Sequence, residues 1–238
     1  MENSVENVDN YVNQNISRGN FMYNKQNEKK ISNAVIRRLP RYFRYLRELI
    51  RNDIMRISSR ELSERMNITA SQIRQDLNCF GGFGQQGYGY NVKSLYSEIS
   101  HILGVDSGLS AVIIGIGNVG KALVNNPLFE KRGIQVKGLF DTDPQIIGTT
   151  LGELTVMSAE QMYSFCKENS IDIAVLSIPK SAANDVATLL CQTGIRGIWN
   201  FSNAEIALNN KNIHIENVHL GDSLMALCYE VALDKENQ

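Results

Sequence analysis

Apolar positions in the first part of the chain follow a helical spacing. From Ser32 they recur three and four residues apart, at Ile36, Leu39, Phe43, Leu46 and Ile50. This periodicity predicts an amphipathic helix. Pro40 lies inside the pattern. Proline lacks a backbone N–H and clashes with the preceding turn, so we expect the helix to restart or kink there.

Two shorter helices follow a short extended piece at 56–58. Ser58 and Glu61 have the spacing of a capping box, which predicts a helix over 60–66. Thr69 and Gln72 have the same spacing and predict a second helix over 70–80, with an inward face of Ile73, Leu77 and Phe80. Helix, short helix, tight turn and polar-faced helix together predict a helix-turn-helix.

A glycine-rich segment, GGFGQQGYGY at 81–90, comes next. Its glycines alternate with aromatic residues and glutamines, which favours a β-hairpin wing over a flexible linker. A helix over 92–103 then connects to a boundary near 104–108. The N-terminal tail, residues 1–30, holds eight asparagines and little apolar periodicity, so we predict that it is disordered.

Short apolar runs and helical patterns alternate in the second part of the chain. We predict strands at 111–114, 134–140, 172–177, 197–200 and 213–218, and helices at 118–125, 158–168 and 181–192. A final amphipathic helix covers about 222–233. Such alternation indicates a parallel sheet with right-handed crossovers. The predicted fold is α/β: a winged helix-turn-helix domain (31–92), a connecting segment (93–108), a Rossmann-type domain (109–219) and a C-terminal helix (220–238).

Three glycines follow the first predicted strand of the second part. Gly115, Gly117 and Gly120 have the G-x-G-x-x-G spacing of a dinucleotide site. The first provides a tight turn, the second lets the backbone approach a pyrophosphate, and the third lets the helix pack closely on the strand. The helix N-terminus offers unpaired N–H groups to the pyrophosphate. The predicted cofactor-binding loop is Gly115, Ile116, Gly117, Asn118, Val119 and Gly120.

Asp141 ends the next apolar run, 21 residues after Gly120. Dinucleotide-binding folds place the carboxylate that binds the ribose hydroxyls near this position. A carboxylate there repels the extra phosphate of NADP, so the pattern favours NAD(H). A coenzyme A site remains a weaker alternative, because the Asp141 carboxylate is typical of a site that binds free ribose hydroxyls.

Charge is divided unevenly along the chain, although the net charge is only −1. Residues 31–92 hold ten arginines and five acids, whereas residues 93–238 hold ten basic and sixteen acidic residues. A basic first domain suggests a polyanionic partner. The four scattered cysteines show no metal-binding spacing and indicate reduced thiols in a cytoplasmic protein, three of them in the core. We expect neither a membrane segment nor a metal site.

Candidate DNA contacts lie on the second helix of the helix-turn-helix and around it. An exposed recognition helix places polar side chains on base edges in the major groove. Arginine can form two hydrogen bonds with guanine, and glutamine can form two with adenine. Hydroxyl groups and positively charged side chains near the start of a helix bind phosphates. A wing tip reaches a minor groove. The predicted contacts are Arg56, Ser58, Ser59, Ser71, Gln72, Arg74, Gln75, Asn78, Gln85 and Gln86. We expect Asp76 to pair with an arginine instead, and Tyr90 to pack in the hairpin.

Several motifs together resemble the redox-sensing repressors of the Rex family. They are RLPRYFRYL (38–46), ISS (57–59), QIRQDL (72–77), FGGFG (80–84), GYGYNV (87–92), GIGNVG (115–120), FDTDP (140–144), IP (178–179) and GIWNF (197–201). The resemblance covers about residues 31–232 and leaves out the N-terminal tail.

The resemblance implies a homodimeric transcriptional repressor with NADH and NAD⁺ as regulatory ligands. It implies that the C-terminal helix is exchanged between subunits and that the dimer binds an A·T-rich inverted repeat at genes of fermentation and respiration. NADH would release the DNA, and NAD⁺ would favour the bound form. The glycine loop would hold the pyrophosphate and Asp141 the adenosine ribose, with Ile178 and Pro179 near the nicotinamide.

The chain departs from the family pattern at three positions. Gln75 stands where many members carry a basic residue. His219 stands where the last strand usually runs into an aspartate, which in the family pairs with an arginine of the first helix, here Arg44. This aspartate–arginine contact is the redox-dependent switch of the family. Asn126 stands where some members have a tyrosine that belongs to the same switch. A neutral histidine offers Arg44 no opposing charge, so we expect DNA binding to persist with a weakened or altered NADH response.

Two other functions compete with the repressor. One is a small NAD-dependent dehydrogenase, which is disfavoured because only some 100 residues follow the glycine loop and no acid–base group is evident. The other is a DNA-binding protein with a vestigial nucleotide site. We therefore predict that the chain is not an enzyme and has no catalytic residues.

Overall fold

The computed structural model describes residues 31–80, 84–85, 88–208 and 212–236. The predicted disorder of residues 1–30 and the predicted DNA contact Gln86 lie outside these residues. Contacts divide the chain into a first unit that ends at Ser107 and a second unit that begins at Gly108.

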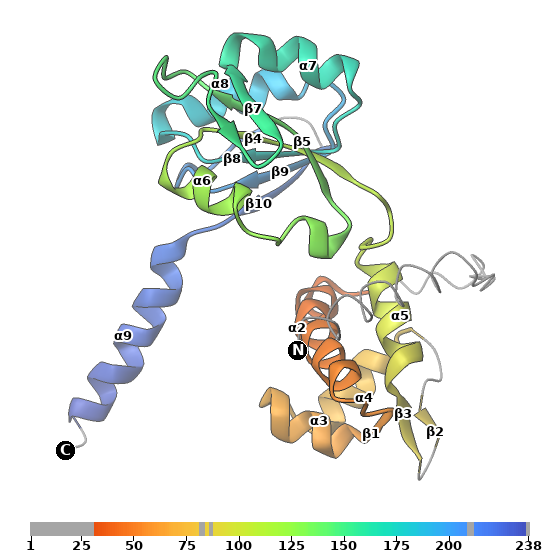
Figure 1. The fold of residues 1–238 in the computed structure, drawn as a ribbon. Helices are drawn as coiled ribbons and strands as arrows, with labels where there is room; N and C mark the ends of the chain where they lie inside the picture. The colour runs from red at the N-terminus through yellow and green to blue at the C-terminus, as the bar shows by residue number, and fades with distance from the viewer. Residues whose placement is uncertain (1–30, 81–83, 86–87, 209–211, 237–238) are drawn as a thin grey trace. The chain divides into compact units, whose positions relative to one another are not determined.

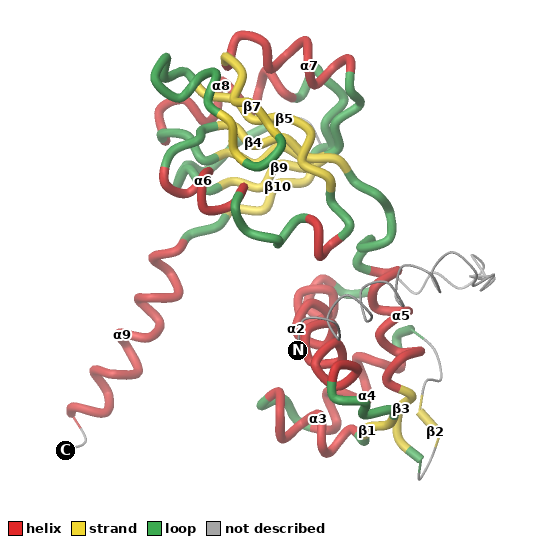
Figure 2. Tube along the Cα trace, viewed as in Figure 1, coloured by secondary structure: helices red, strands yellow, loops and turns green. Residues whose placement is uncertain are grey.

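Helix α2 (Asn33–Arg51) is the longest helix among the described residues of the first unit (Figures 1 and 2). Ser32 caps it, with Oγ accepting a hydrogen bond from the backbone N–H of Val35. The helix continues through Pro40, so the predicted restart does not occur. Apolar side chains buried on both sides of Pro40 hold the two halves in one helix: Val35, Leu39, Tyr42, Phe43, Leu46, Leu49 and Ile50.

The helix-turn-helix consists of α3 (Ser59–Met66) and α4 (Ala70–Asn78). The predicted capping box of Ser58 and Glu61 is present in full, and Asn67 ends α3 in the left-handed conformation. Half of the second predicted box forms: Thr69 accepts from the N–H of Gln72, but the Gln72 side chain turns to Asp76 instead. Helix α4 ends two residues earlier than predicted, and Phe80 is only partly buried.

A small antiparallel sheet completes the first unit. Its strands are β1 (Arg56–Ile57), β2 (Gly84–Gln85) and β3 (Gly89–Asn91), in the order β1-β3-β2. The predicted hairpin is therefore present, with Gly84 opposite Tyr90 and Gln85 opposite Gly89. Tyr90 is buried, as predicted, whereas Tyr88 is 70% exposed. Helix α5 (Val92–Ile102) packs against α2 and belongs to the same core.

A seven-stranded sheet forms the centre of the second unit (Figures 1 and 2). The five predicted strands are present: β4 (Ser110–Ile114), β5 (Gln135–Asp141), β8 (Ile173–Leu176), β9 (Gly197–Asn200) and β10 (His214–Asn217). Two strands were not predicted, β6 (Thr150–Leu151) and β7 (Leu154–Ser158). The order is β10-β9-β8-β4-β5-β7-β6, parallel except for β6. Without β6 this is the 3-2-1-4-5-6 order of a Rossmann fold.

Helices cover both faces of this sheet. They are α6 (Asn118–Val124), α7 (Met162–Glu168) and α8 (Lys180–Leu190), with short 3₁₀ turns η2 (Glu130–Arg132) and η3 (Ala159–Gln161). Alternate residues of β4 enter different cores. Val112 and Ile114 pack in the core that includes residues of α7 and α8, and Ile113 packs in the core that includes residues next to α6. Burial on both faces explains why the strand is a continuous apolar run.

Helix α9 (Leu220–Glu236) ends the described chain. Its large apolar side chains are exposed: Leu220, Leu224, Met225, Leu227, Tyr229, Val231 and Leu233. The cysteine prediction was wrong in detail, because Cys166 is buried and Cys191 half-buried, but Cys79 and Cys228 are exposed. Among the described residues, no helix combines the length and the apolar character that a membrane crossing requires.

Asp172 stabilises the amino end of the sheet, where it accepts hydrogen bonds from the backbone N–H and hydroxyl of Ser110 and pairs with Arg196. Burial raises the pKa of this carboxyl, but these hydrogen bonds outweigh burial and leave the pKa below its usual value. A lowered pKa means that the stabilisation is present above the unfolded-state pKa of about 3.9 and disappears as pH falls through the folded-state pKa.

We therefore expect Asp172→Asn to destabilise the second unit at pH 7 and to have a smaller effect at pH 3. Urea unfolding followed by the fluorescence of Trp199, the single tryptophan of the chain, measures this difference. An equal effect at both pH values would contradict the assignment.

Candidate dinucleotide and DNA sites

The three glycines of the loop between β4 and α6 have different surroundings. Gly115 has φ +89°, and a Cβ there would collide with the carbonyl oxygen of Ser177. A Cβ on Gly120 would overlap the carbonyl oxygen of Gly115, so α6 can approach the strand only with glycine at this position. A Cβ on Gly117 would meet no atom within 4 Å, and this glycine is exposed. The loop is thus tight at both ends and open in the middle, as a pyrophosphate site requires.

The Asp141 carboxylate connects β5 to the glycine loop. Oδ2 accepts a hydrogen bond from the N–H of Ile116 at 2.5 Å, and Oδ1 accepts from the N–H groups of Thr142 and Asp143 at 2.7 and 2.9 Å. Asp141 therefore holds the loop beside the end of β5. A carboxylate has about four lone-pair positions, so capacity remains for a ribose hydroxyl.

Ser177 holds the other side of the loop, at the end of β8. Its Oγ donates to the carbonyl of Gly115 at 2.7 Å, and its N–H donates to the carbonyl of Ile114 at 2.9 Å. Ile178 and Pro179 follow directly and lead into α8, with Pro179 at the N-cap. The carboxyl ends of three adjacent strands carry these groups: β4 leads into the glycine loop, β5 ends at Asp141, and β8 leads into Ser177, Ile178 and Pro179. The chain places β5 on one side of β4 and β8 on the other, so the strand order reverses at β4. Ligands bind at this point in open α/β sheets.

Helix α4 presents a polar face in the first unit. Ser71, Arg74, Gln75 and Asn78 are exposed, while Ser58, Ser59 and Gln72 are half-buried. Arg74 Nη1 donates to Ser59 Oγ at 3.0 Å, which brings the recognition helix and the start of α3 together. Arg56 is exposed and lies over the Tyr88 ring, with the guanidinium carbon 5.9 Å from the ring centre. Gln85, one of the two predicted wing contacts, lies in strand β2.

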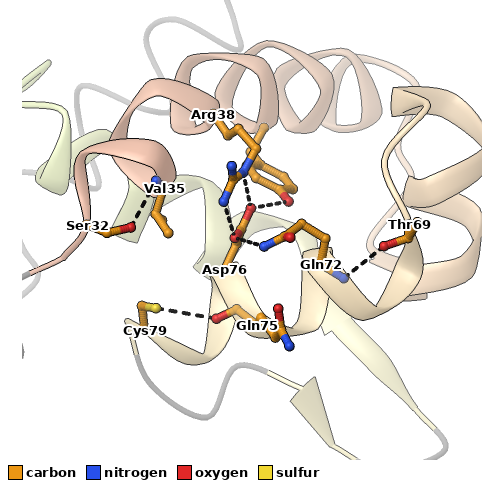
Figure 3. Close-up of polar contacts among 9 residues, drawn as sticks. Ser32, Val35, Arg38, Thr69, Gln72, Gln75, Asp76 and Cys79 are labelled. Atoms are coloured by element: carbon orange, nitrogen blue, oxygen red, sulfur yellow. Dashed lines mark hydrogen bonds and ion pairs between the residues drawn. The ribbon is translucent and has the colours of Figure 1, made fainter.

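Asp76 lies below this polar face and is completely buried (Figure 3). Arg38 Nε donates to Oδ2 at 2.7 Å and Nη2 donates to Oδ1 at 2.8 Å, which confirms the predicted arginine partner. The Tyr42 hydroxyl donates to Oδ2 at 3.0 Å, and Gln72 Nε2 donates to Oδ1 at 2.8 Å. Burial raises the pKa of the carboxyl, but the hydrogen bonds from Arg38, Gln72 and Tyr42 outweigh burial and keep the pKa below its usual value.

The three residues of the expected switch lie in or next to different elements. Arg44 is exposed on α2 and Asn126 is exposed after α6. His219 directly precedes α9, and its Nε2 lies 3.4 Å from Glu205 Oε1. His101 Nδ1 also lies 3.2 Å from Asp106 Oδ2. The sequence predicted neither carboxylate contact. No group of three potential metal ligands occurs within the described part of the chain.

Sequence reasoning did not identify Arg38, Tyr42 or Ser177 as supporting residues. Arg38 and Tyr42 are four residues apart and therefore share a helix face, which is a weak signal that the pair has a common partner. Ser177 carries no comparable signal, because its contact with Gly115 spans 62 residues.

These observations define a class of protein: a winged helix-turn-helix unit joined to a Rossmann-type dinucleotide-binding unit. Two family models match the same halves. Residues 30–78 match a putative DNA-binding protein N-terminus, and residues 106–204 match a CoA binding domain.

Known proteins similar to this chain are redox-sensing transcriptional repressors named Rex. The protein from Clostridium botulinum strain Eklund 17B is 51% identical over 203 residues, which cover 85% of this chain and 96% of the relative. The protein from Thermoanaerobacter pseudethanolicus is 52% identical over 202 residues, covering 85% and 90%. The chain therefore belongs to the Rex family of redox-sensing transcriptional repressors.

Solved structures give the same result. RSP in complex with β-NAD⁺ and operator DNA has a TM-score of 0.81 and 51% identity, covering 86% of this chain and 94% of RSP. RSP in complex with β-NADH has a TM-score of 0.79 and 46% identity, covering 89% and 100%. The relatives are named as redox-sensing repressors and not as enzymes, and RSP has been solved with β-NADH, so these similarities support the NADH-responsive repressor over both alternatives.

Proposed function

We propose that this protein is a DNA-binding transcriptional repressor that senses the ratio of NADH to NAD⁺. NADH binding releases it from an A·T-rich inverted-repeat operator of fermentation and respiration genes, and NAD⁺ favours the DNA-bound form. It works as a homodimer in the cytoplasm. The exposed apolar residues of α9 support the dimer, since a helix with this surface needs a partner to cover it.

The nucleotide is proposed to bind at the carboxyl ends of the strands of the second unit. The N–H groups at the start of α6 hold the pyrophosphate next to open Gly117, and Asp141 binds the adenosine ribose. Ile178 and Pro179 lie near the nicotinamide. Two hydrogen bonds support this proposal, one from Ile116 N–H to Asp141 and one from Ser177 Oγ to the carbonyl of Gly115, because they hold the loop in place before a ligand arrives.

DNA is proposed to bind across α4, the start of α3 and the wing. Arg74, Gln75, Gln72, Ser71 and Asn78 face the major groove. Ser58, Ser59 and Arg56 hold phosphates, and Gln85 and Gln86 reach the minor groove. Arg44, Asn126 and His219 are the positions through which the nucleotide affects DNA binding in this proposal.

One observation carries the proposal: a single chain joins an open glycine loop to a basic winged helix-turn-helix unit, and a relative 51% identical to it holds β-NAD⁺ and operator DNA together. Effector and operator are then thermodynamically linked. A ligand shifts the equilibrium only by its difference in affinity for the two states. NADH and the operator therefore weaken each other's binding by the same factor, whereas NAD⁺ and the operator strengthen each other's binding by a common factor.

We expect saturating NADH to weaken operator binding by a factor in the lower part of the roughly 5- to 150-fold range that is usual for coupling between two sites, because a neutral His219 offers Arg44 no opposing charge. The operator is first selected from random oligonucleotides, and its affinity is then measured by fluorescence anisotropy with NADH, with NAD⁺ and without nucleotide. Arg74→Ala is the matched control: it should weaken DNA binding and leave the NADH affinity of the free protein unchanged. Equal operator affinity with and without NADH would overturn the sensing function.

A further inference from the structure

Gln72 is a candidate base contact on α4 whose side-chain amide is hydrogen-bonded to a buried group (Figure 3). Its Nε2 donates to Asp76 Oδ1 at 2.8 Å, across one turn of the helix. Among the described residues, no group donates a hydrogen bond to Gln72 Oε1. The amide is therefore held by its nitrogen end.

The charge of Asp76 fixes which end of the amide faces it. An ionised carboxylate only accepts hydrogen bonds, so it must face the NH₂ group and not Oε1. Its lowered pKa keeps Asp76 ionised at neutral pH. A flipped Gln72 amide would place two acceptor oxygens together, so the flipped orientation is disfavoured.

The carboxylate is itself held rigidly. Arg38 binds both of its oxygens, and the Tyr42 hydroxyl binds Oδ2. Arg38 and Tyr42 both come from α2, which anchors the recognition helix to the core of the first unit. A side chain held in this way loses less rotamer freedom when it binds a ligand.

We infer that Asp76 is a positioning residue that orients Gln72 to read a base carrying an exocyclic amino group. This inference rests on the proposed DNA-binding function. The fixed Oε1 accepts from the amino group of adenine or cytosine, while guanine and thymine present only acceptors at the corresponding major-groove edge. Adenine is preferred, because its N7 can also accept from the second N–H of the amide.

Gln75 provides a matched comparison on the same helix. It is exposed, and Figure 3 draws its side chain away from Asp76. An amide that is not held can turn either end to a base, so Gln75 discriminates less between bases that offer donors and bases that offer acceptors.

The test measures base preference with the full-length protein. Operators are selected from random DNA by the wild type, by Gln72→Met and by Gln75→Met. The affinities are then measured for operators that differ at one base pair. We expect one position per half-site at which the wild type prefers adenine over guanine by about 10-fold, the size of one specific base contact. Gln72→Met should lose this preference, and Gln75→Met should keep it.

Asp76→Asn tests the positioning role. It should reduce the preference at the same position by about 3-fold or more and leave the preferences elsewhere unchanged. A ratio of two affinities is independent of the fraction of folded protein, so lower stability does not disturb this measurement. If Asp76→Asn does not fold, NMR of the wild type tests the same contact. The signals of the Gln72 side-chain amide protons are assigned by their loss in Gln72→Met. They should lie downfield of the corresponding Gln75 signals.

The outcomes separate the inference from the proposed function. A wild type that selects an operator while Gln72→Met retains every base preference overturns the inference alone. The same holds for Asp76→Asn if it weakens all operators equally, or for Gln72 amide signals that match those of Gln75. A wild type that selects no operator overturns the proposed function.

Discussion

Asp76→Asn is expected to lower the free energy of unfolding of the first unit by about 3 kcal/mol, the lower end of the range for removing one partner of a buried ion pair. The variant leaves Arg38 without its counter-charge and removes an acceptor for Tyr42. The lower end applies because the Arg38 side chain is 28% exposed and can regain some hydration.

Hydrogen exchange of α2 and α4 measures this loss, because it reports the local stability of each helix. Trp199 lies in the second unit, so its fluorescence transition in urea should stay unchanged. Gln75→Ala on the same helix is the control, with an expected change within about 0.5 kcal/mol. Exchange rates in Asp76→Asn equal to those of the control would show that the buried pair does not stabilise the helix-turn-helix.

Gly120→Ala is expected to destabilise the second unit by about 1–3 kcal/mol, as overpacking does in a close-packed interior. The added methyl group would overlap the carbonyl oxygen of Gly115 and push α6 away from β4. Because this movement distorts the loop, we also expect NADH affinity to fall by at least about tenfold. Urea unfolding followed by Trp199 fluorescence gives the first quantity, and titration with NADH gives the second.

Gly117→Ala should change NADH affinity without changing the free energy of unfolding. Nothing lies within 4 Å of a Cβ at this position, so stability should stay within about 0.5 kcal/mol of the wild type. NADH affinity should still fall, since the methyl group occupies the space that the pyrophosphate enters. Unchanged NADH affinity in Gly117→Ala would place the pyrophosphate elsewhere.

Local patterns explain why much of the fold could be predicted. The capping box of Ser58 and Glu61 and the glycine loop before α6 involve residues close together in sequence, and each has one favoured geometry. Strands β6 and β7 were missed because they span two and five residues and only Val156 of β7 is fully buried. The link from β5 to β7 also lacks a helix, so the alternation of strand and helix fails there.

Long-range contacts account for what the sequence could not reveal in the site. Asp141 was predicted as a ribose ligand, but its hydrogen bond to Ile116 spans 25 residues and has no local pattern. Gln72 fitted a capping box by spacing, yet the buried charge of Asp76 attracts its amide more strongly than the helix end does. Such competition depends on burial, which emerges only after α2 and α4 pack together.

Helix α9 has a consequence for the amount of protein that a cell must maintain. Leu224, Leu227 and Val231 are 60%, 59% and 47% exposed in a single chain. In the proposed homodimer a second copy of the chain covers them, and association of this kind makes stability rise with protein concentration. Dilution of the proposed homodimer should therefore lower its melting temperature, so the cellular concentration of the chain would affect its stability as well as the fraction of operator that it binds.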